Sequence, residues 1–268
     1  MNNLDLIEKP SSFLGQKILE IAQSLGKVAL LFKNTLRWMR HRPLDWNNVF
    51  NQMLEIGVRS LPVTTLTSLF TGMVLALQTG FSSRNIFNEP IYVGTVVGFS
   101  LVKELGPVLT AVIIAGRVGA SIAAELGTMK VTEQIDALYT LGTNPIKYLA
   151  VPRFIACLVV IPILTVLAIA TGIIGGFLVS VYKLHIPSSV YYDDIFNFMR
   201  MDDFFHGLIK SFFFAIIIVV VSCYKGFECH GGAEGVGKAT TSAVVVSMVL
   251  ILVSDYFITA LLAFLGIG

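Results

Sequence analysis

The sequence has 268 residues, of which 55% are hydrophobic and only 13% are charged, and its formal net charge is +2. Soluble domains carry roughly 25% charged residues, so this composition, with a mean hydropathy of +0.78, excludes a soluble globular protein and indicates an integral membrane protein. The small net charge gives no indication of nucleic-acid binding. Three cysteines without CxxC spacing, one of them next to His230, do not make a metal site, because no second pair of ligands accompanies Cys229 and His230.

The first 49 residues predict a cytoplasmic region with an amphipathic helix. Asp5 and Glu8 lie near the start and no apolar core follows, so we expect neither a signal peptide nor a transit peptide. From Leu14 to Phe32 apolar residues recur every three or four positions. A coiled-coil seam would show a similar pattern, but this one is shorter than three heptads and runs into a basic stretch with two tryptophans. A helix in the membrane interface fits that composition better.

Five apolar segments are long enough to cross a bilayer, which takes about 20 residues in a helix. Together with their connections they predict an all-α membrane domain over residues 50–268. The predicted spans are about 60–83, 90–124, 154–182, 204–224 and 239–267.

The basic residues of the connections set the orientation. With the N-terminus inside, the cytoplasmic stretches hold thirteen Lys and Arg residues and the outer stretches hold three. The positive-inside rule therefore puts the N-terminus in the cytoplasm and, after five spans, the C-terminus outside. The outer connection 183–203 mixes aromatic residues with four aspartates, which predicts a short helix at the outer face.

The second span carries a ladder of small residues at a spacing of four. Such a stripe lets another helix approach closely. The pattern does not say whether that helix belongs to the same chain or to a second copy. The ladder consists of Ala111, Ala115, Gly119, Ala123 and Gly127.

Four charged residues fall at similar depth inside predicted spans, in the outer half. Each is costly in a membrane, by about 2.5 to 3.5 kcal/mol on insertion scales, and so calls for a partner or a water-filled cavity. They form either a neutral clamp between helices or a polar patch in the wall of a cavity that contacts a charged headgroup. These residues are Lys103, Glu104, Lys210 and Asp255.

Two other residues of the second span bear on its shape and charge. We expect Pro107, after Gly106, to break or bend the helix. Arg117 lies nearer the cytoplasmic end, where we expect its side chain to extend toward the interface or to pair with Glu125.

A short polar helix is predicted between the second and third spans. Thr132 is the expected N-cap, and Gly142 with Asn144-Pro145 ends the helix. A solvated connector is the alternative, but it would need neither a cap nor an apolar stripe. The pattern favours a helix that docks a soluble partner, with polar residues Glu133, Gln134 and Asp136 exposed and apolar residues Ile135, Leu138 and Leu141 on another face.

One motif resembles a nucleotide-binding loop but lacks an essential residue. Gly232, Gly237 and Lys238 have the GxxxxGK spacing, but Ala239 stands where a P-loop needs Ser or Thr for magnesium. We therefore expect this chain to bind no ATP and no other cofactor. No nucleophile–base arrangement for an enzyme is visible either.

Several ordered stretches resemble the MlaE/YrbE permease family, over roughly residues 50–264. They are ELGPVLTAVIIAGRVGASIAAELGTMKVTEQIDAL, NPIKYLAVPRF, IPILT, KSFFFAIII and GGAEGVGKATTSAVV. The resemblance implies a homodimeric permease of an ABC transporter that works with a cytoplasmic ATPase, which binds ATP and magnesium, and an outer MCE-domain lipid-binding protein. It implies phospholipid transport between inner and outer membranes, which maintains outer-membrane lipid asymmetry, or transport between the equivalent plastid membranes. Without a transit peptide, we expect a bacterial inner membrane.

The resemblance also assigns roles to residues. Polar contacts near the lipid cavity fall on Lys103, Glu104, Lys210 and Asp255, and we expect the cavity walls to include Leu75, Leu77, Gln78, Phe81 and Leu101. Coupling to the ATPase falls on Glu125, Gly127, Thr128, Met129, Lys130, Glu133, Gln134 and Asp136. Two other classes stay open, a secondary transporter and a membrane-embedded lipid enzyme. The direction of transport and the preferred headgroup do not follow from the sequence.

Overall fold

The protein is a bundle of long helices, seen in a computed structural model that describes residues 5–41, 45–87 and 92–266. Within these ranges the regular structure is helical and there is no strand. Three π-helical segments, named η1 to η3, interrupt the α-helices. The elements are α1 (Asp5–Met39), α2 (Trp46–Phe87), α3 (Val93–Phe99), η1 (Ser100–Leu105), α4 (Gly106–Ile114), η2 (Ala115–Gly119), α5 (Ala120–Val131), α6 (Gln134–Thr140), η3 (Ile146–Ala150), α7 (Val151–Tyr182), α8 (Ser188–Phe198), α9 (Met201–Phe227) and α10 (Gly232–Phe264).

The predicted all-α class with five spans is confirmed. Five described helical stretches are long and apolar enough to cross a membrane: Trp46–Ser83, Val93–Val131, Ile146–Tyr182, Met201–Phe227 and Gly232–Phe264. The first begins well before the predicted residue 60, because α2 continues through a polar stretch. At 42 residues this helix is about 63 Å long, so part of it extends beyond a hydrocarbon core of about 30 Å.

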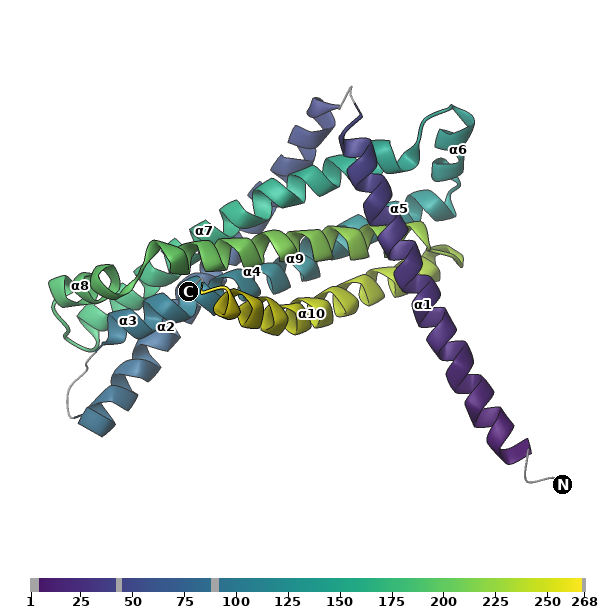
Figure 1. Ribbon diagram of the computed structural model, residues 1–268. Helices are drawn as coiled ribbons and strands as arrows, with labels where there is room; N and C mark the ends of the chain where they lie inside the picture. The colour runs from purple at the N-terminus through teal and green to yellow at the C-terminus, as the bar shows by residue number, and fades with distance from the viewer. Residues whose placement is uncertain (1–4, 42–44, 88–91, 267–268) are drawn as a thin grey trace.

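Short helices lie in both connections where they were predicted. The α6 helix connects the second and third spans, and α8 connects the third and fourth (Figure 1). The long α1 helix crosses the end of the bundle near α5, and Lys27 Nζ lies 3.0 Å from Glu228 Oε1. Hydrogen bonding to Glu228 raises the pKa of Lys27. The interfacial position of α1 and the boundary at residue 49 stay predictions.

The second span is continuous through Pro107, so the helix does not break there, and a bend at this point stays a prediction. Instead, η1 widens the helix just before the proline, and the Gly106 N–H donates to the carbonyl oxygen of Leu101, five residues earlier. Pro107 has no N–H to donate, which leaves the carbonyl oxygen of Val102 without the next bond of this ladder. Gly207 of α9 approaches that oxygen so closely that a Cβ built on it would lie 2.1 Å away. The wide turn thus absorbs the proline within a continuous helix.

Glycines allow α2 and α7 to pack backbone against backbone. A Cβ built on Gly72 would lie 1.9 Å from the carbonyl oxygen of Gly172, and one on Gly175 would lie 2.1 Å from that of Leu69. No side chain can occupy these positions without moving the helices apart, so α2 and α7 form one rigid pair.

The small-residue ladder packs inside one copy of the chain. All five members are buried, Gly119 faces Ser222 and Ile218 of α9, and Gly127 faces Cys229 and Val236. The partner helices that the sequence left open are therefore α9 and the start of α10 of the same chain.

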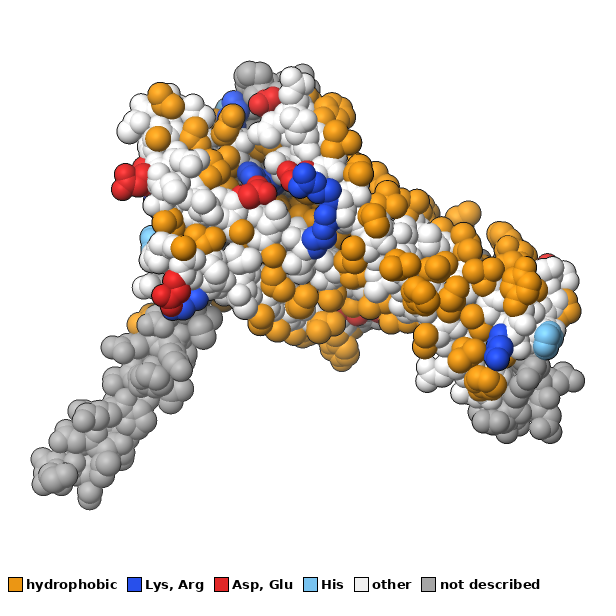
Figure 2. All heavy atoms as spheres, turned by 180° about the vertical axis from the view of Figure 1, so that it is seen from behind, with side chains coloured by type: hydrophobic (Ala, Val, Ile, Leu, Met, Phe, Trp, Pro, Cys, Tyr) orange, Lys and Arg blue, Asp and Glu red, His pale blue; other side chains and the backbone are white. Residues whose placement is uncertain are grey.

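The five spans differ in how far the protein covers them. The most apolar windows of the second, third and fourth spans are 50% to 56% buried, but those of the first and last are 28% and 11% buried. On the face shown in Figure 2, hydrophobic side chains cover long stretches, and one group of acidic and basic side chains lies together while a few others are scattered. The exposed apolar face of α10, which includes Val249, Leu252 and Phe257, must contact lipid or another protein.

The close α2–α7 contact predicts that Gly72→Ala destabilises the protein. Overpacking costs about 1 to 3 kcal/mol, and the contacted atom is a backbone oxygen that cannot move aside. We expect a lower thermal unfolding midpoint, measured by scanning fluorimetry in detergent.

Gly237→Ala is the matched control, because a Cβ built on this helical glycine meets nothing within 4 Å. Its midpoint should stay the same or rise. Equal midpoints for the two variants would contradict the close approach of the helices.

Candidate functional site

Three of the four charged residues predicted to lie together meet around Lys210, whose side chain is fully buried. Its Nζ lies 2.5 Å from Glu104 Oε2 and 2.8 Å from Asp255 Oδ1. Lys210 comes from α9, Glu104 from η1 and Asp255 from α10, so one ammonium group joins three spans. Burying an ion pair is favourable only with such close partners.

Lys103 lies apart from this group and pairs with a residue that the sequence analysis missed. Its Nζ is 2.8 Å from Oδ1 of Asp203, which also accepts a hydrogen bond from the Arg200 N–H at 2.9 Å and so caps α9. A signal was available, because Asp203 precedes Lys210 by seven residues, which is two helical turns on one face. In the sequence Asp203 is one of four aspartates of the connection 183–203, and hydropathy alone does not distinguish it from the others.

The group around Lys210 and the neighbouring Lys103–Asp203 pair together contain one more carboxylate than cations. Lys103 and Lys210 face Glu104, Asp203 and Asp255, and Thr259 donates its hydroxyl to Glu104 Oε1 at 3.3 Å. The side chain of Glu104 is 41% exposed and that of Lys103 is 26% exposed. Lys210 joins three helices through ion pairs and has no exposed surface, whereas the charged side chains of Glu104 and Lys103 remain partly exposed.

The five predicted wall residues divide into two groups. Leu75 and Leu77 are half-buried and Gln78 and Phe81 are exposed on α2. Leu101 is only 1% exposed and lies where a Cβ on Gly172 would meet its side chain at 2.9 Å. It therefore belongs to the packing between η1 and α7 inside the chain. Leu75 packs against the same buried cluster, so the exposed members of the set are Gln78 and Phe81.

The predicted coupling region lies at the opposite end of the second span. Thr132 is not the cap of α6, as we had expected, because its hydroxyl donates to the Thr128 carbonyl oxygen at 2.8 Å at the end of α5. Glu133 begins the helix instead, with a left-handed φ of 59°, and Gly142 ends it with a φ of 73°. Lys130 lies 3.1 Å from Asp136 and ties the turn together.

The exposed surface of α6 is both polar and apolar. Glu133, Gln134 and Asp136 are exposed, as are Thr128 and, partly, Glu125, Met129 and Lys130, whereas Gly127 is buried. Ile135 is buried, but Leu141 is 78% exposed and Tyr139 is 58% exposed. Leu141 lies beyond the end of α6, so it does not continue the apolar stripe toward the protein. Tyr139 was not predicted, and no periodic signal marks it.

Glu125 and Arg117 have other partners than expected. Glu125 pairs with Arg153 at 2.7 Å, and Arg117 donates to the Ser60 hydroxyl at 2.8 Å. Burial raises the pKa of the Cys229 thiol. Among the described residues no group of three or more His, Cys, Asp or Glu is arranged to hold a metal ion.

Comparison with known proteins gives a consistent result. The family model described as Permease MlaE matches residues 49–261. A probable ABC transporter permease protein of Rickettsia typhi is 48% identical over 254 residues, which cover 94% of this chain and 97% of that protein. Probable ABC transporter permease proteins of Synechocystis and of Pyropia yezoensis are 44% and 40% identical, over 84% and 88% of this chain and 85% and 90% of theirs. With five candidate spans and this extent of similarity, the chain belongs to the MlaE permease family.

Proposed function

We propose that this protein is the membrane subunit of an ABC transporter that moves phospholipid between the inner and outer membranes of a bacterium, together with an outer MCE-domain protein. Such transport would maintain the lipid asymmetry of the outer membrane. The observation that carries the proposal is the second span, a continuous helix with the charged network near one end and α6 at the other. The names of the relatives support the ABC permease assignment.

A partner would supply the energy. Gly232 to Lys238, the sequence with P-loop spacing, forms the first turns of α10, and Lys238 Nζ pairs with Glu234 at 2.7 Å. A P-loop surrounds phosphates with the N–H groups of a loop, but here the segment is wound into α10, so that only the N–H groups of its first turn lack helical partners. In this proposal a cytoplasmic ATPase, carrying ATP and magnesium, docks on α6 through Glu133 and the exposed Tyr139 and Leu141.

A second copy of the chain would complete the lipid cavity. Of the five spans, α10 is the one that the rest of the chain covers least, and α2 is the next least covered. A cavity between two copies would have the exposed α2 residues Gln78 and Phe81 as walls and Lys103 and Glu104 at its polar end. Movement of α6 on ATP binding would reach that end through the second span. The N-terminus would lie in the cytoplasm and the C-terminus in the periplasm.

The exposed charge of Lys103 predicts a transport defect without loss of assembly. Lys103→Ala removes a partly exposed cation at the proposed cavity, and we expect lipid transfer between reconstituted liposomes and the MCE protein to fall about tenfold, the effect of about 1.4 kcal/mol. Co-purification with the ATPase should be unchanged.

The matched control is Arg200→Ala, which removes another outer cation, paired with Asp202 at 3.5 Å and strongly exposed. It should transfer lipid normally. Equal transfer by both variants would mean that Lys103 does not contact lipid and that its role is limited to the ion pair with Asp203 of α9.

Because Lys210 is buried between two carboxylates, variants of this group should affect the stability of the protein and its lipid transfer differently. Lys210→Met leaves two carboxylates facing each other without a cation, which costs about 3 to 5 kcal/mol, and should lower the unfolding midpoint. Adding Glu104→Gln and Asp255→Asn removes the unpaired charge and should restore the midpoint, measured by scanning fluorimetry.

Lipid transfer by this triple variant should remain defective, because Glu104 no longer carries charge at the cavity. Restored transfer would show that the network acts only as a helix clamp. If the triple variant is as unstable as Lys210→Met, the unpaired carboxylates are not the cause of the lost stability.

The position of Glu133 predicts that Glu133→Lys abolishes co-purification with the ATPase that accompanies the wild-type protein. A reversed charge at the start of α6 would face the docked partner directly. Glu234→Lys is the control, since Glu234 is exposed in the first turn of α10. An intact complex in the Glu133 variant would remove α6 from the interface.

A further inference from the structure

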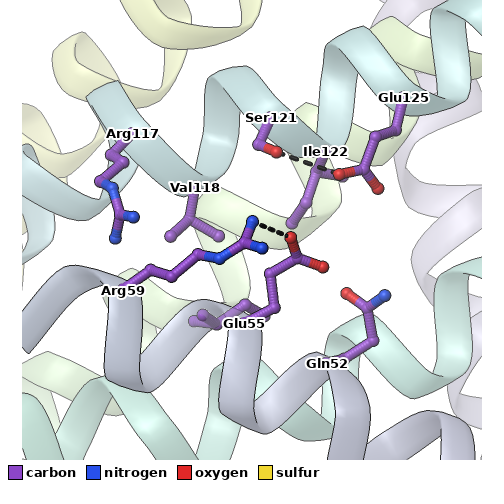
Figure 3. Close-up of a pocket in the computed structure, with 9 residues that line it drawn as sticks. Gln52, Glu55, Arg59, Arg117, Val118, Ser121, Ile122 and Glu125 are labelled. Atoms are coloured by element: carbon purple, nitrogen blue, oxygen red, sulfur yellow. Dashed lines mark hydrogen bonds and ion pairs between the residues drawn. The ribbon is translucent and has the colours of Figure 1, made fainter.

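A polar pocket of about 210 Å³ opens between α2 and the part of the second span nearest α6. Figure 3 shows its polar side chains: Gln52, Glu55 and Arg59 come from α2, and Arg117, Ser121 and Glu125 come from the facing helix. Its lining also includes the buried apolar residues Ile56, Val118 and Ile122. We call it the α2–α5 pocket. It lies at the opposite end of the span from Lys210 and its partners.

The charges around the α2–α5 pocket do not balance. Glu55 is neutralised by Arg59, with Nη1 and Oε1 2.5 Å apart, and Glu125 is neutralised by Arg153 at 2.7 Å. Arg117 has a hydroxyl partner, Ser60, but no carboxylate among the described residues. Three guanidinium groups against two carboxylates leave one positive charge.

That charge lies inside a membrane span. Arg117 is eight residues farther from α6 than Glu125, or about 12 Å along the helix. A guanidinium group has five N–H donors, and one serine hydroxyl accepts only a small part of them. An ionised group at this depth calls for a counter-charge or for water, and the remaining donors form a planar fork that matches a phosphate or carboxylate.

An apolar track continues from the pocket along α2. The residues that follow Arg59 on its exposed face are Val63, Leu66 and Phe70, at steps of four, three and four, and they are 48%, 58% and 56% exposed. The track runs away from α6. A molecule with its anionic group at Arg117 and its hydrocarbon chains on this track would have the orientation of a lipid in the membrane leaflet on the α6 side.

We propose that the α2–α5 pocket binds the phosphodiester headgroup of an anionic phospholipid from that leaflet. One phosphodiester carries one negative charge, which is the charge that the pocket lacks. Arg117 and Arg59 hold the phosphate, Gln52 and Ser121 contact the rest of the headgroup, and the acyl chains lie on Val63, Leu66 and Phe70. The site is separate from the cavity near Lys103, and lipid binding here does not require that the protein transports lipid.

The test measures phosphatidylglycerol bound to the full-length protein in phosphatidylcholine nanodiscs that contain a small fraction of phosphatidylglycerol. We expect Arg117→Gln to weaken retention, followed by native mass spectrometry, about tenfold. Arg117→Lys keeps the charge without the planar fork and should lie between this variant and the wild type. Arg200→Gln, on the opposite side of the membrane, should retain lipid normally.

A second variant covers the case in which Arg117→Gln fails to fold. Ser121→Trp fills the pocket from an exposed position while every charge remains, and it should reduce retention to a similar extent. Unchanged retention in Ser121→Trp, or in a folded Arg117→Gln, would overturn the proposal.

Two further results would also overturn the proposal, because each would show that the pocket has another occupant. If excess inorganic phosphate displaces phosphatidylglycerol from the wild type, the ligand is a free anion. If Ser121→Cys forms a disulfide between copies, the pocket is covered by a second copy of the chain; the native cysteines are all buried, so such a bond would come from the introduced one.

Discussion

The burial of one ammonium group fixes how the helices pack in the half of the bundle that lies farther from α6. Lys210 has no exposed surface and contacts carboxylates from two other spans. In an apolar environment each of these ions would be costly alone, and together they oblige η1, α9 and α10 to stay in register. This constraint matters most for α10, which the rest of the chain covers least. Near α6 the same helix is held differently, by close contact with small residues such as Gly127.

The second span is shaped by where its charges lie. Lys103 and Glu104 lie in η1 and Arg117 lies in η2, so every charged residue deep in this span falls in a π-helical segment. Such segments widen the turn and free backbone groups, and they often occur at functional sites. Here one of them also absorbs Pro107. Along this helix η2 lies between α6 and the Lys210 network, and η1 carries the network's own Glu104.

The elements that could be predicted from the sequence are those that depend on the length of an apolar segment and on residues that end a helix. The five spans, α8 and the stop of α6 at Gly142 follow from hydropathy and from a single left-handed glycine. The π-helical segments could not be predicted, because their apolar pattern is the same as that of an α-helix. Depth along the spans correctly grouped Glu104 with Lys210 and Asp255, but it could not resolve that Lys103 turns to Asp203. Leu101 shows the same limit, since hydrophobicity alone does not say which apolar face is internal.

The two polar regions of the second span differ in the charge that they can match. Near Lys210 the network has one excess carboxylate, and its accessible members are a cation and an anion next to each other in the chain, Lys103 and Glu104. The α2–α5 pocket instead has one cation without a carboxylate. A zwitterionic headgroup can satisfy the first arrangement, because its ammonium and phosphate groups can face opposite charges, whereas the second requires a net negative group. Each region thus sets its own electrostatic condition, and a lipid that suits one of them need not suit the other.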